Sequence, residues 1–213
     1  MNNKPNDNNR WRRRKESRPG EIIEAALELF VANGFNATRL EEVAKLAGVS
    51  KGTVYLYFDS KEDLFRAVVQ QTIIPEIEKA EQRAAEFRGS QRELLTLLIQ
   101  NWWNVVGKTR LAGIPKLMIS EATNFPEVAE YYLDKVVNRV RKLIKNSILI
   151  GIEQGEFKSS DPIITTRLLV APMLFAVIWE KSLAPFDSEN YDLESYIQLH
   201  LSVFFDGISL NNV

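Results

Sequence analysis

The sequence has no cysteine and a single histidine, His200, in 213 residues. Without cysteine the chain can form neither disulfides nor thiolate metal sites, and the cytoplasm is the expected compartment. One histidine is too few for a histidine-based metal cage, so we expect neither a metal nor a cofactor. The longest uninterrupted apolar run, LLVAPMLFAVIW, has 12 residues and contains Pro172. A membrane span needs roughly 18 apolar residues, so we expect no membrane partner.

The sequence signatures of common enzymes are also missing. There is no nucleophile elbow, no Gly-rich phosphate loop, no zinc motif and no Cys–His pair. A catalytic pair of carboxylates would leave no such signature, but nothing else in the sequence points to an enzyme. We therefore expect no enzymatic activity.

Glycine and proline are scarce, with 10 and 8 residues, and stretches in which apolar and polar residues alternate are few. Apolar residues instead recur at three- and four-residue spacing along most of the chain, as in amphipathic helices. With 45% hydrophobic and 26% charged residues, the composition is that of an ordinary globular protein with a sizeable core. The sequence therefore predicts an all-α fold.

Charge is distributed unevenly along the chain, although the formal net charge is only −1. Residues 1–20 hold seven Lys or Arg against two Asp or Glu, a balance of +5, which leaves −6 for the remaining 193 residues. A basic end on an acidic body is typical of a tip that faces nucleic acid, although a solvated leader has the same composition. We predict that residues 1–19 form a basic, flexible arm. It has no apolar core and does not resemble a secretory signal.

The segment after this arm has the pattern of short, separate helices. A first helix ends at Asn33-Gly34, where glycine allows a left-handed C-cap. Thr38 followed by Glu41 is a capping box, which predicts a second helix from about Arg39. The apolar stripe of the first helix, with the spacing of an amphipathic helix, consists of Ile22, Ile23, Ala26, Leu27, Phe30 and Val31.

The second helix is short and ends at Gly48. Ser50 then caps a third helix, and the order of helix, tight turn and helix is the helix-turn-helix arrangement. Ser60 with Asp63 forms another capping box and opens a longer helix. We therefore predict a three-helix, helix-turn-helix domain over residues 20–66.

The third helix begins within VSKGTVYLYF, an unusual sequence for a helix that only packs against a core. Ser50 caps the helix, so its first free N–H groups point outward with partial positive charge, and a phosphate fits there. Gly52 weakens the helix by about 1 kcal/mol relative to alanine, but it lets a DNA backbone or base edge approach closely. Lys51 supplies charge, and Thr53 supplies a hydroxyl and a methyl for base edges.

The other residues of this stretch divide into two faces. Val54 and Phe58 are four residues apart and form the inward face. Tyr55 and Tyr57 point outward, where their hydroxyls can reach phosphates, and Lys61 at the start of the next helix adds a cation. A compact three-helix unit with aromatic packing explains some of these features, but together they favour a surface that enters a DNA groove.

The block FVANGFNATRLEEVAKLAGVSKGTVYLYFDSKEDLF resembles the DNA-binding domain of the tetracycline-repressor (TetR) family. The match covers roughly Glu21 to Phe65 and rests on the elements NGF, T-x-x-E, GVSKGT-x-Y-x-YF and SKEDLF, in order and at the family spacing. The resemblance implies a double-stranded DNA operator as partner. It implies DNA contacts from Thr38, Arg39, Ser50, Lys51, Gly52, Thr53, Tyr55, Tyr57 and Lys61.

The arm before this block is longer and more basic than the family minimum. We hypothesise that Trp11 to Lys15 lie in the minor groove, where arginine is favoured. The sequence does not determine whether the arm contacts DNA.

Residues 67–213 are predicted to form a larger helical domain for effector binding and dimerisation. Pro75 interrupts the fourth helix, and Pro115 and Pro126 each lie near a helix start. QRELLTLLIQNWWNVVGKTR has the pattern of one amphipathic helix. Asp161 precedes a proline and caps another long helix.

The last two helices, residues 163–183 and 192–208, are apolar on more than one side. A helix of this kind must be buried on more than one side. We predict that one side packs on the protein's own core and the other on a second copy, as a four-helix bundle across a two-fold axis. A homodimer also suits the first domain, because paired helix-turn-helix units read palindromic half-sites about 34–36 Å apart.

In the larger domain the resemblance to the TetR family is weaker. The stretches IPKLMISEATNFPEVAEYY and GEFKSSDP look like the effector domain of a branch that includes multidrug-responsive repressors. The resemblance implies the same homodimer and a small-molecule effector that binds in a cavity inside this domain.

Aromatic and methionine side chains form adaptable apolar walls, although each of them fits a simple core or interface role equally well. The candidate lining residues are Trp102, Trp103, Asn104, Met118, Phe125, Tyr132, Phe175 and Trp179. Glu121 and Asn124 either orient a polar group of the effector or face solvent. His200 is expected at an interface or as a capped polar residue.

These observations favour a ligand-responsive, dimeric transcriptional regulator, and a repressor in particular. The effector would shift the population towards a conformer whose recognition helices are wrongly spaced for DNA. The alternative is a DNA-binding regulator without a small ligand, controlled by a protein partner. The absence of a cavity near Trp102 and Met118 would favour that alternative. The sequence names neither the operator nor the effector, for which an apolar compound is only the simplest expectation.

Overall fold

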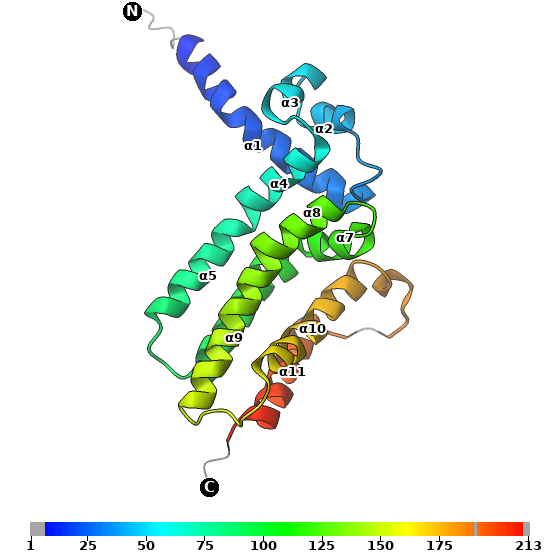
Figure 1. The fold of residues 1–213 in the computed structure, drawn as a ribbon. Coiled ribbons are helices and arrows are strands. Elements are labelled where there is room, and N and C mark those ends of the chain that lie inside the picture. The colour runs from blue at the N-terminus through cyan, green and yellow to red at the C-terminus, as the bar shows by residue number, and fades with distance from the viewer. Residues whose placement is uncertain (1–6, 190, 211–213) are drawn as a thin grey trace, which may run out of the picture. The chain divides into compact units, whose positions relative to one another are not determined.

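The computed structural model describes residues 7–189 and 191–210, with side chains from Arg18 onward. The chain divides into two compact units, an N-terminal unit (Met1–Gln71) and a C-terminal unit (Thr72–Val213). The elements of the described residues are all helical, joined by one isolated antiparallel bridge between Phe157 and Ser209, which confirms the all-α class (Figure 1).

The N-terminal unit contains four helices. They are α1 (Asp7–Asn33), α2 (Leu40–Leu46), α3 (Lys51–Tyr57) and α4 (Lys61–Thr72). The units divide after Gln71, later than the predicted boundary at residues 66 and 67, because α4 continues without a break to Thr72.

Helix α1 starts earlier than the sequence suggested. It begins at Asp7, so that residues 7–19 belong to a helix instead of a separate arm. Their run of arginine and lysine consists of good helix formers, which favours continuation of the helix. The hypothesis about Trp11 to Lys15 concerns side chains that lie outside the described residues.

Three phenylalanines form the centre of the N-terminal unit. The ring of Phe35 lies 5.3 Å from that of Phe30 and 5.8 Å from that of Phe65, and the Phe30 and Phe65 rings are also 5.8 Å apart. Val54 and Phe58 are buried, as the pattern of the third helix predicted. This core therefore fixes one face of α3 and leaves the other face exposed.

The predicted capping box of Thr38 and Glu41 is wrong. The Thr38 side chain is only 2% exposed, and its hydroxyl donates to the carbonyl oxygens of Leu29 (3.1 Å) and Gly34 (2.7 Å). Arg39 is the N-cap of α2, and its backbone N–H donates to the Glu42 carboxylate at 3.4 Å. The reason is burial, because the loop turns the Thr38 hydroxyl inward to satisfy carbonyl groups of α1.

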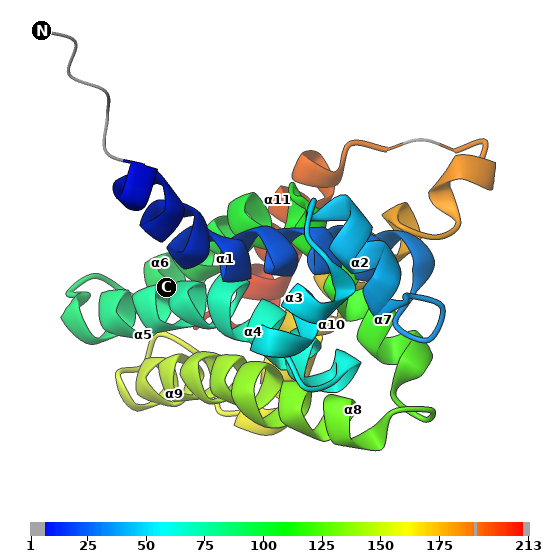
Figure 2. The same ribbon diagram turned by 90° about the horizontal axis from the view of Figure 1, so that it is seen from above.

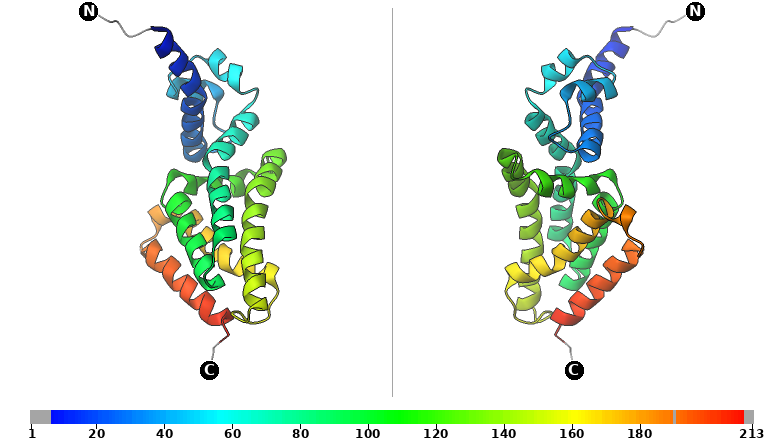
Figure 3. Two further views of the ribbon diagram at one scale, coloured as in Figure 1. Left: turned by 90° about the vertical axis from the view of Figure 1, so that its left-hand side faces the viewer. Right: turned by 90° about the vertical axis from the view of Figure 1, so that its right-hand side faces the viewer.

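The C-terminal unit is a bundle whose core is formed by side chains of α6, α9, α10 and α11, with α5 beside α9 (Figure 2) and α10 beside α11 (Figure 3). Its elements are α5 (Ile74–Glu86), α6 (Gln91–Trp102), η1 (Trp103–Gly107), η2 (Arg110–Ala112), α7 (Gly113–Glu121), α8 (Pro126–Tyr132), η3 (Leu133–Val137), α9 (Asn138–Glu153), α10 (Pro162–Glu180), η4 (Ala184–Phe186) and α11 (Leu193–Ile208).

Two long helical segments of this unit are broken by π-helical turns, η1 and η3. The stretch predicted as one helix, residues 91–110, therefore changes its winding at Trp103. The wider turn brings the Trp103 ring against Gly107, where a Cβ atom would overlap the indole. Pro75 likewise starts a separate helix, α5, since α4 has already ended at Thr72.

Helix α10 is long and apolar enough to cross a membrane by length and composition, although a continuous apolar run of that length is missing from the sequence. Of its apolar stretch, 33% is buried. Since α10 packs against α7, α9 and α11, it also fits the description of a core helix, which passes the same test. Its other face exposes apolar side chains, including Ile164, Leu168 and Phe175.

The carboxylate of Glu156 ties the turn after α9 to the start of α6. It accepts hydrogen bonds from the backbone N–H groups of Gln91 (3.0 and 2.8 Å) and Arg92 (3.3 Å). Ser90 caps the same helix by accepting from the Glu93 N–H at 3.2 Å. Together the two side chains satisfy N–H groups that a helix leaves without an intrahelical partner.

Glu156→Ala is expected to lower the free energy of unfolding by about 1–2 kcal/mol, because two backbone donors lose their acceptor. Urea unfolding followed by circular dichroism measures the loss. Glu156→Gln keeps one acceptor oxygen and should lose less. Glu153→Ala, on the exposed last turn of α9, serves as the control, and an equal loss in that variant would show that the cap is not the cause.

Candidate nucleic-acid interface

The N-terminus of α3 is organised by two hydroxyl groups. The Ser50 hydroxyl accepts from the backbone N–H of Thr53 at 3.1 Å, which confirms the predicted cap. The two side-chain hydroxyls also lie 2.9 Å apart and share a hydrogen bond. This cap allows α3 to begin at Lys51 and fixes the direction in which its outer face points.

Gly52 lies on the exposed face of α3 with space above it. A Cβ atom added there would meet only Ser50 Oγ, at 3.8 Å, within the described residues. Its backbone does not have a positive φ angle either. Neither packing nor backbone conformation therefore requires glycine here, although glycine in a helix costs about 1 kcal/mol relative to alanine. The residue makes sense if something outside the chain approaches this helix closely.

The outward face of α3 combines polar and apolar groups. Lys51 and Tyr55 are exposed, and Thr53 and Tyr57 are half-buried. Leu56 is 73% exposed and was not among the predicted residues. The signal for it was present, because a large apolar residue between two inward positions, Val54 and Phe58, has to point outward. Its methyl groups can contact thymine methyls.

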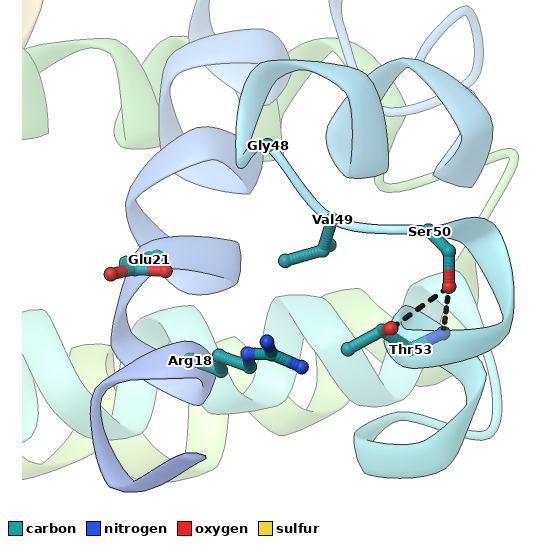
Figure 4. A pocket seen from close by; sticks show the side chains of 6 residues that line it. All are labelled: Arg18, Glu21, Gly48, Val49, Ser50 and Thr53. Atoms are coloured by element: carbon teal, nitrogen blue, oxygen red, sulfur yellow. Dashed lines mark hydrogen bonds between the residues drawn. The ribbon is translucent and has the colours of Figure 1, made fainter. Parts of the chain in front are cut away.

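A hollow lies between the middle of α1 and the turn that leads into α3 (Figure 4). Arg18 extends from α1 towards Thr53 in this hollow. The lining residues are Arg18, Glu21, Gly48, Val49, Ser50 and Thr53. Sequence reasoning missed Arg18, because only the fold brings the middle of α1 next to Ser50. The hollow thus adds a cation to the surface that carries α3.

Lys51 is held by groups of its own chain. Its ammonium group forms an ion pair with Glu41 of α2 and lies 5.6 Å from the centre of the Tyr55 ring. The hydrogen bond between them lowers the pKa of the Glu41 carboxyl and raises the pKa of Lys51. Both side chains are about half exposed, each at 53%, so a partner in solution can reach the pair.

Two of the residues proposed for DNA contact have internal roles. The Lys61 ammonium donates to the carbonyl oxygens of Asn36 (3.0 Å) and Thr38 (3.3 Å) and lies 4.7 Å from the centre of the Phe35 ring. The Thr38 side chain is buried, and its hydroxyl donates to carbonyl oxygens of its own unit. Arg39, in contrast, is exposed at the start of α2.

The predicted effector residues lie in different surroundings within the C-terminal unit. Trp103 is buried in the bundle core with Trp102 packed against it, and its indole N–H has no acceptor within the described residues. The Phe175 side chain is 61% exposed, and its ring centre lies 5.9 Å from that of the half-buried Trp179. The other candidates are the buried Met118, the half-buried Phe125 and Tyr132, and the exposed Asn104.

A hollow on α5 is lined by other residues, namely Lys79, Gln82, Arg83, Glu86 and Phe87. Burial raises the pKa of the Tyr132 hydroxyl, which therefore stays protonated and can donate a hydrogen bond. Asn124 donates to the Glu121 carboxylate at 3.4 Å. The Nε2 atom of His200 lies 2.8 Å from the Leu169 carbonyl oxygen, so the His200 ring has a hydrogen-bond partner within the chain.

Comparison with known proteins links both units to one class. Residues 22–68 match the family described as "Bacterial regulatory proteins, tetR family", and residues 93–190 match the "AefR-like transcriptional repressor, C-terminal domain". The HTH-type transcriptional regulator YhgD of Bacillus subtilis is 30% identical over 85% of this chain and 95% of its own. The fatty acid metabolism regulator protein of the same organism is 27% identical over 91% and 98%. These relatives are transcriptional regulators, not enzymes.

A solved structure has a similar fold. The transcriptional regulator FadR from Bacillus subtilis, in complex with stearoyl-CoA, superposes with a TM-score of 0.70, covering 88% of this chain and 97% of that one. At 24% sequence identity this likeness concerns the fold alone.

Lys61→Met is expected to lower the free energy of unfolding by about 1–2 kcal/mol, because the loop carbonyls of Asn36 and Thr38 lose a charged donor. Thermal or urea unfolding of the full chain measures this. Lys45→Met removes the same charge from an exposed position on α2 and should change stability much less. Equal stability of Lys61→Met and the wild type would exclude an anchoring role for the ammonium group.

Proposed function

This chain belongs to the TetR family of bacterial transcriptional regulators, and from that premise we propose that it is a cytoplasmic repressor acting as a homodimer. It reads a palindromic operator in the major groove with α3 of each protomer. A small, mainly apolar effector in the C-terminal unit releases it from DNA.

Gly52 is the observation that carries the DNA-binding part of this proposal. A glycine that the fold does not need, on the exposed face of a capped helix, suits a helix that a DNA backbone or base edge approaches. Around it, Thr53 and Leu56 are placed to meet base edges. Phosphate oxygens can accept hydrogen bonds from the side chains of Lys51, Tyr55, Tyr57, Arg39 and Arg18. Ser50 caps α3 and so orients the first N–H groups of the helix.

Thr38 and Lys61 act in this scheme as positioning residues. Both hold the loop between α1 and α2, through the Thr38 hydroxyl and the Lys61 ammonium group. That loop leads directly into Arg39 at the start of α2. Their contribution to DNA binding is therefore the placement of α2, not a direct contact.

An exposed apolar face on the last two helices supports the homodimer. On α10, Ile164, Leu168 and Phe175 are 57%, 60% and 61% exposed; on α11, Leu199 and Val203 are 65% and 63% exposed. Large apolar side chains gathered on one face mark an interaction surface. A second copy placing the same two helices against them would bury this face in a four-helix bundle.

The effector is proposed to enter where the two π-helical turns lie. Trp102 and Trp103 stand at the junction of α6 and η1, and Tyr132 stands at the junction of α8 and η3. π-helical turns inside α-helices occur frequently at functional sites. The buried indole N–H of Trp103 and the protonated Tyr132 hydroxyl offer donors to an acyl carbonyl. Relatives that regulate fatty acid metabolism or bind stearoyl-CoA support an effector with an apolar chain.

Release follows from a population shift. A ligand changes DNA binding only by the difference in its affinity for the two conformers. Trp103 belongs to the buried core of the C-terminal unit, so an acyl chain that binds beside it would favour a conformer in which this core has opened. In that conformer the two α3 helices of the dimer no longer match successive major grooves.

One observation favours a second candidate, a DNA-binding regulator that has no small ligand and is controlled by a protein partner. Trp103 and Met118 are both buried, and neither residue lines the hollow beside Ser50 or the hollow on α5. A direct binding experiment separates this candidate from the first.

Gly52→Ala is expected to raise the free energy of unfolding by about 0.5–1 kcal/mol and to weaken operator binding at least tenfold, because a methyl group then stands between the helix and DNA. The operator is first obtained by sequencing genomic fragments that the protein retains at about 150 mM salt, where phosphate-only binding is weak.

Fluorescence anisotropy then compares the variants on that operator, and sedimentation checks their oligomeric state. Gly52→Glu and Tyr57→Ala should abolish operator binding while the oligomeric state is unchanged. Normal binding by Gly52→Glu would show that α3 is not the recognition helix. Failure to enrich any palindrome would exclude operator binding by the free protein.

Stearoyl-CoA is expected to bind the protein and release it from the operator, with coenzyme A alone as the control. Trp103→Phe keeps an aromatic, although smaller, ring and removes the indole N–H, so the variant should still fold and respond less. Calorimetry measures binding and anisotropy measures release. No binding by stearoyl-CoA or by a range of acyl and aromatic compounds would favour the candidate controlled by a protein partner.

A further inference from the structure

The N-terminal unit is not basic outside its first residues. From Arg18 to Gln71 the sequence has six Lys or Arg against eight Asp or Glu, a formal net charge of −2. Attraction to phosphates depends on cations that neutralise them. On a DNA-binding surface with so few cations, the affinity for DNA therefore depends on whether each cation is free to contact a phosphate.

Lys51 is the exposed cation on α3, and its charge is already matched within the protein. The carboxylate of Glu41 on α2 forms an ion pair with the Lys51 ammonium, which also lies 5.6 Å from the Tyr55 ring centre. A phosphate that takes a hydrogen bond from this ammonium group has to replace the carboxylate. The half-exposed position of both partners leaves the pair open to such exchange.

We propose that Glu41 is an internal competitor of DNA phosphate for Lys51, and that it sets the affinity of the regulator below what its recognition helix could otherwise reach. This inference rests on the proposed function. Because non-specific binding consists almost entirely of phosphate contacts, the restraint acts on non-specific DNA at least as strongly as on the operator. Glu41 therefore limits the time that the protein spends on irrelevant sequences.

A simpler possibility is that Glu41 repels phosphates directly, without involving Lys51. The two mechanisms differ in a double-mutant cycle. In competition, removing the Glu41 charge tightens binding only while Lys51 is present. In direct repulsion, the same substitution tightens binding equally when Lys51 has been replaced.

The experiment measures dissociation constants of the wild type, Glu41→Gln, Lys51→Met and the double variant for the selected operator and for a scrambled duplex. Glu41→Gln should bind both duplexes about two- to fivefold more tightly, the range for an exposed ion pair. Its affinity should also fall more steeply with salt, by up to about 0.9 in the slope of a double-logarithmic plot, the equivalent of one phosphate contact. In the Lys51→Met background the gain should disappear.

Asp59→Asn is the matched control, since it removes one exposed negative charge just after α3 without touching Lys51. It should tighten binding less than Glu41→Gln. If the wild type binds operator but Glu41→Gln binds no more tightly, the inference is wrong and the proposed function stands. An equal gain in the Lys51→Met background also overturns it. If the wild type selects no operator, both fail together.

Discussion

The packing of Phe35 between Phe30 and Phe65 is the contact on which the DNA-binding surface depends. It holds the loop after α1 against α4, and the Lys61 ammonium covers the same ring while donating to two carbonyls of that loop. The loop leads into α2, and α2 packs on α3. The direction of α3 therefore follows from a few aromatic contacts in the core of the N-terminal unit.

Helix caps and the inward faces of helices were predicted well from the sequence, whereas the burial of a loop side chain was not. Ser50 and Asp161 cap their helices as expected, since a cap needs only a side chain and the next few backbone N–H groups. Thr38 carries an equally good capping pattern, but the fold turns it inward, which no short stretch of sequence reveals. Arg18 was missed for the same reason, because its neighbours lie in another part of the chain.

In the C-terminal unit the composition indicated a pocket and an interface without separating them. Aromatic residues are suited to a pocket and to an interface, and only their exposure in the structure distinguishes the two roles. Trp103 lies in the core, whereas Phe175 lies on the face left open beside α11. The π-helical turns next to Trp103 and Tyr132 had no sequence signal at all, since helix propensity does not distinguish a widened turn from a regular one.

The last turn of α11 is bonded to the turn between α9 and α10. The Lys158 N–H donates to the Ile208 carbonyl at 2.7 Å, and the Leu210 N–H donates to the Glu156 carbonyl at 3.0 Å. During synthesis, N-terminal domains generally fold first, so the first unit can form while the second still waits for residues 208–210. A chain that ends before residue 208 would lack both hydrogen bonds, so this end of the C-terminal unit would stay open although the N-terminal unit had already formed.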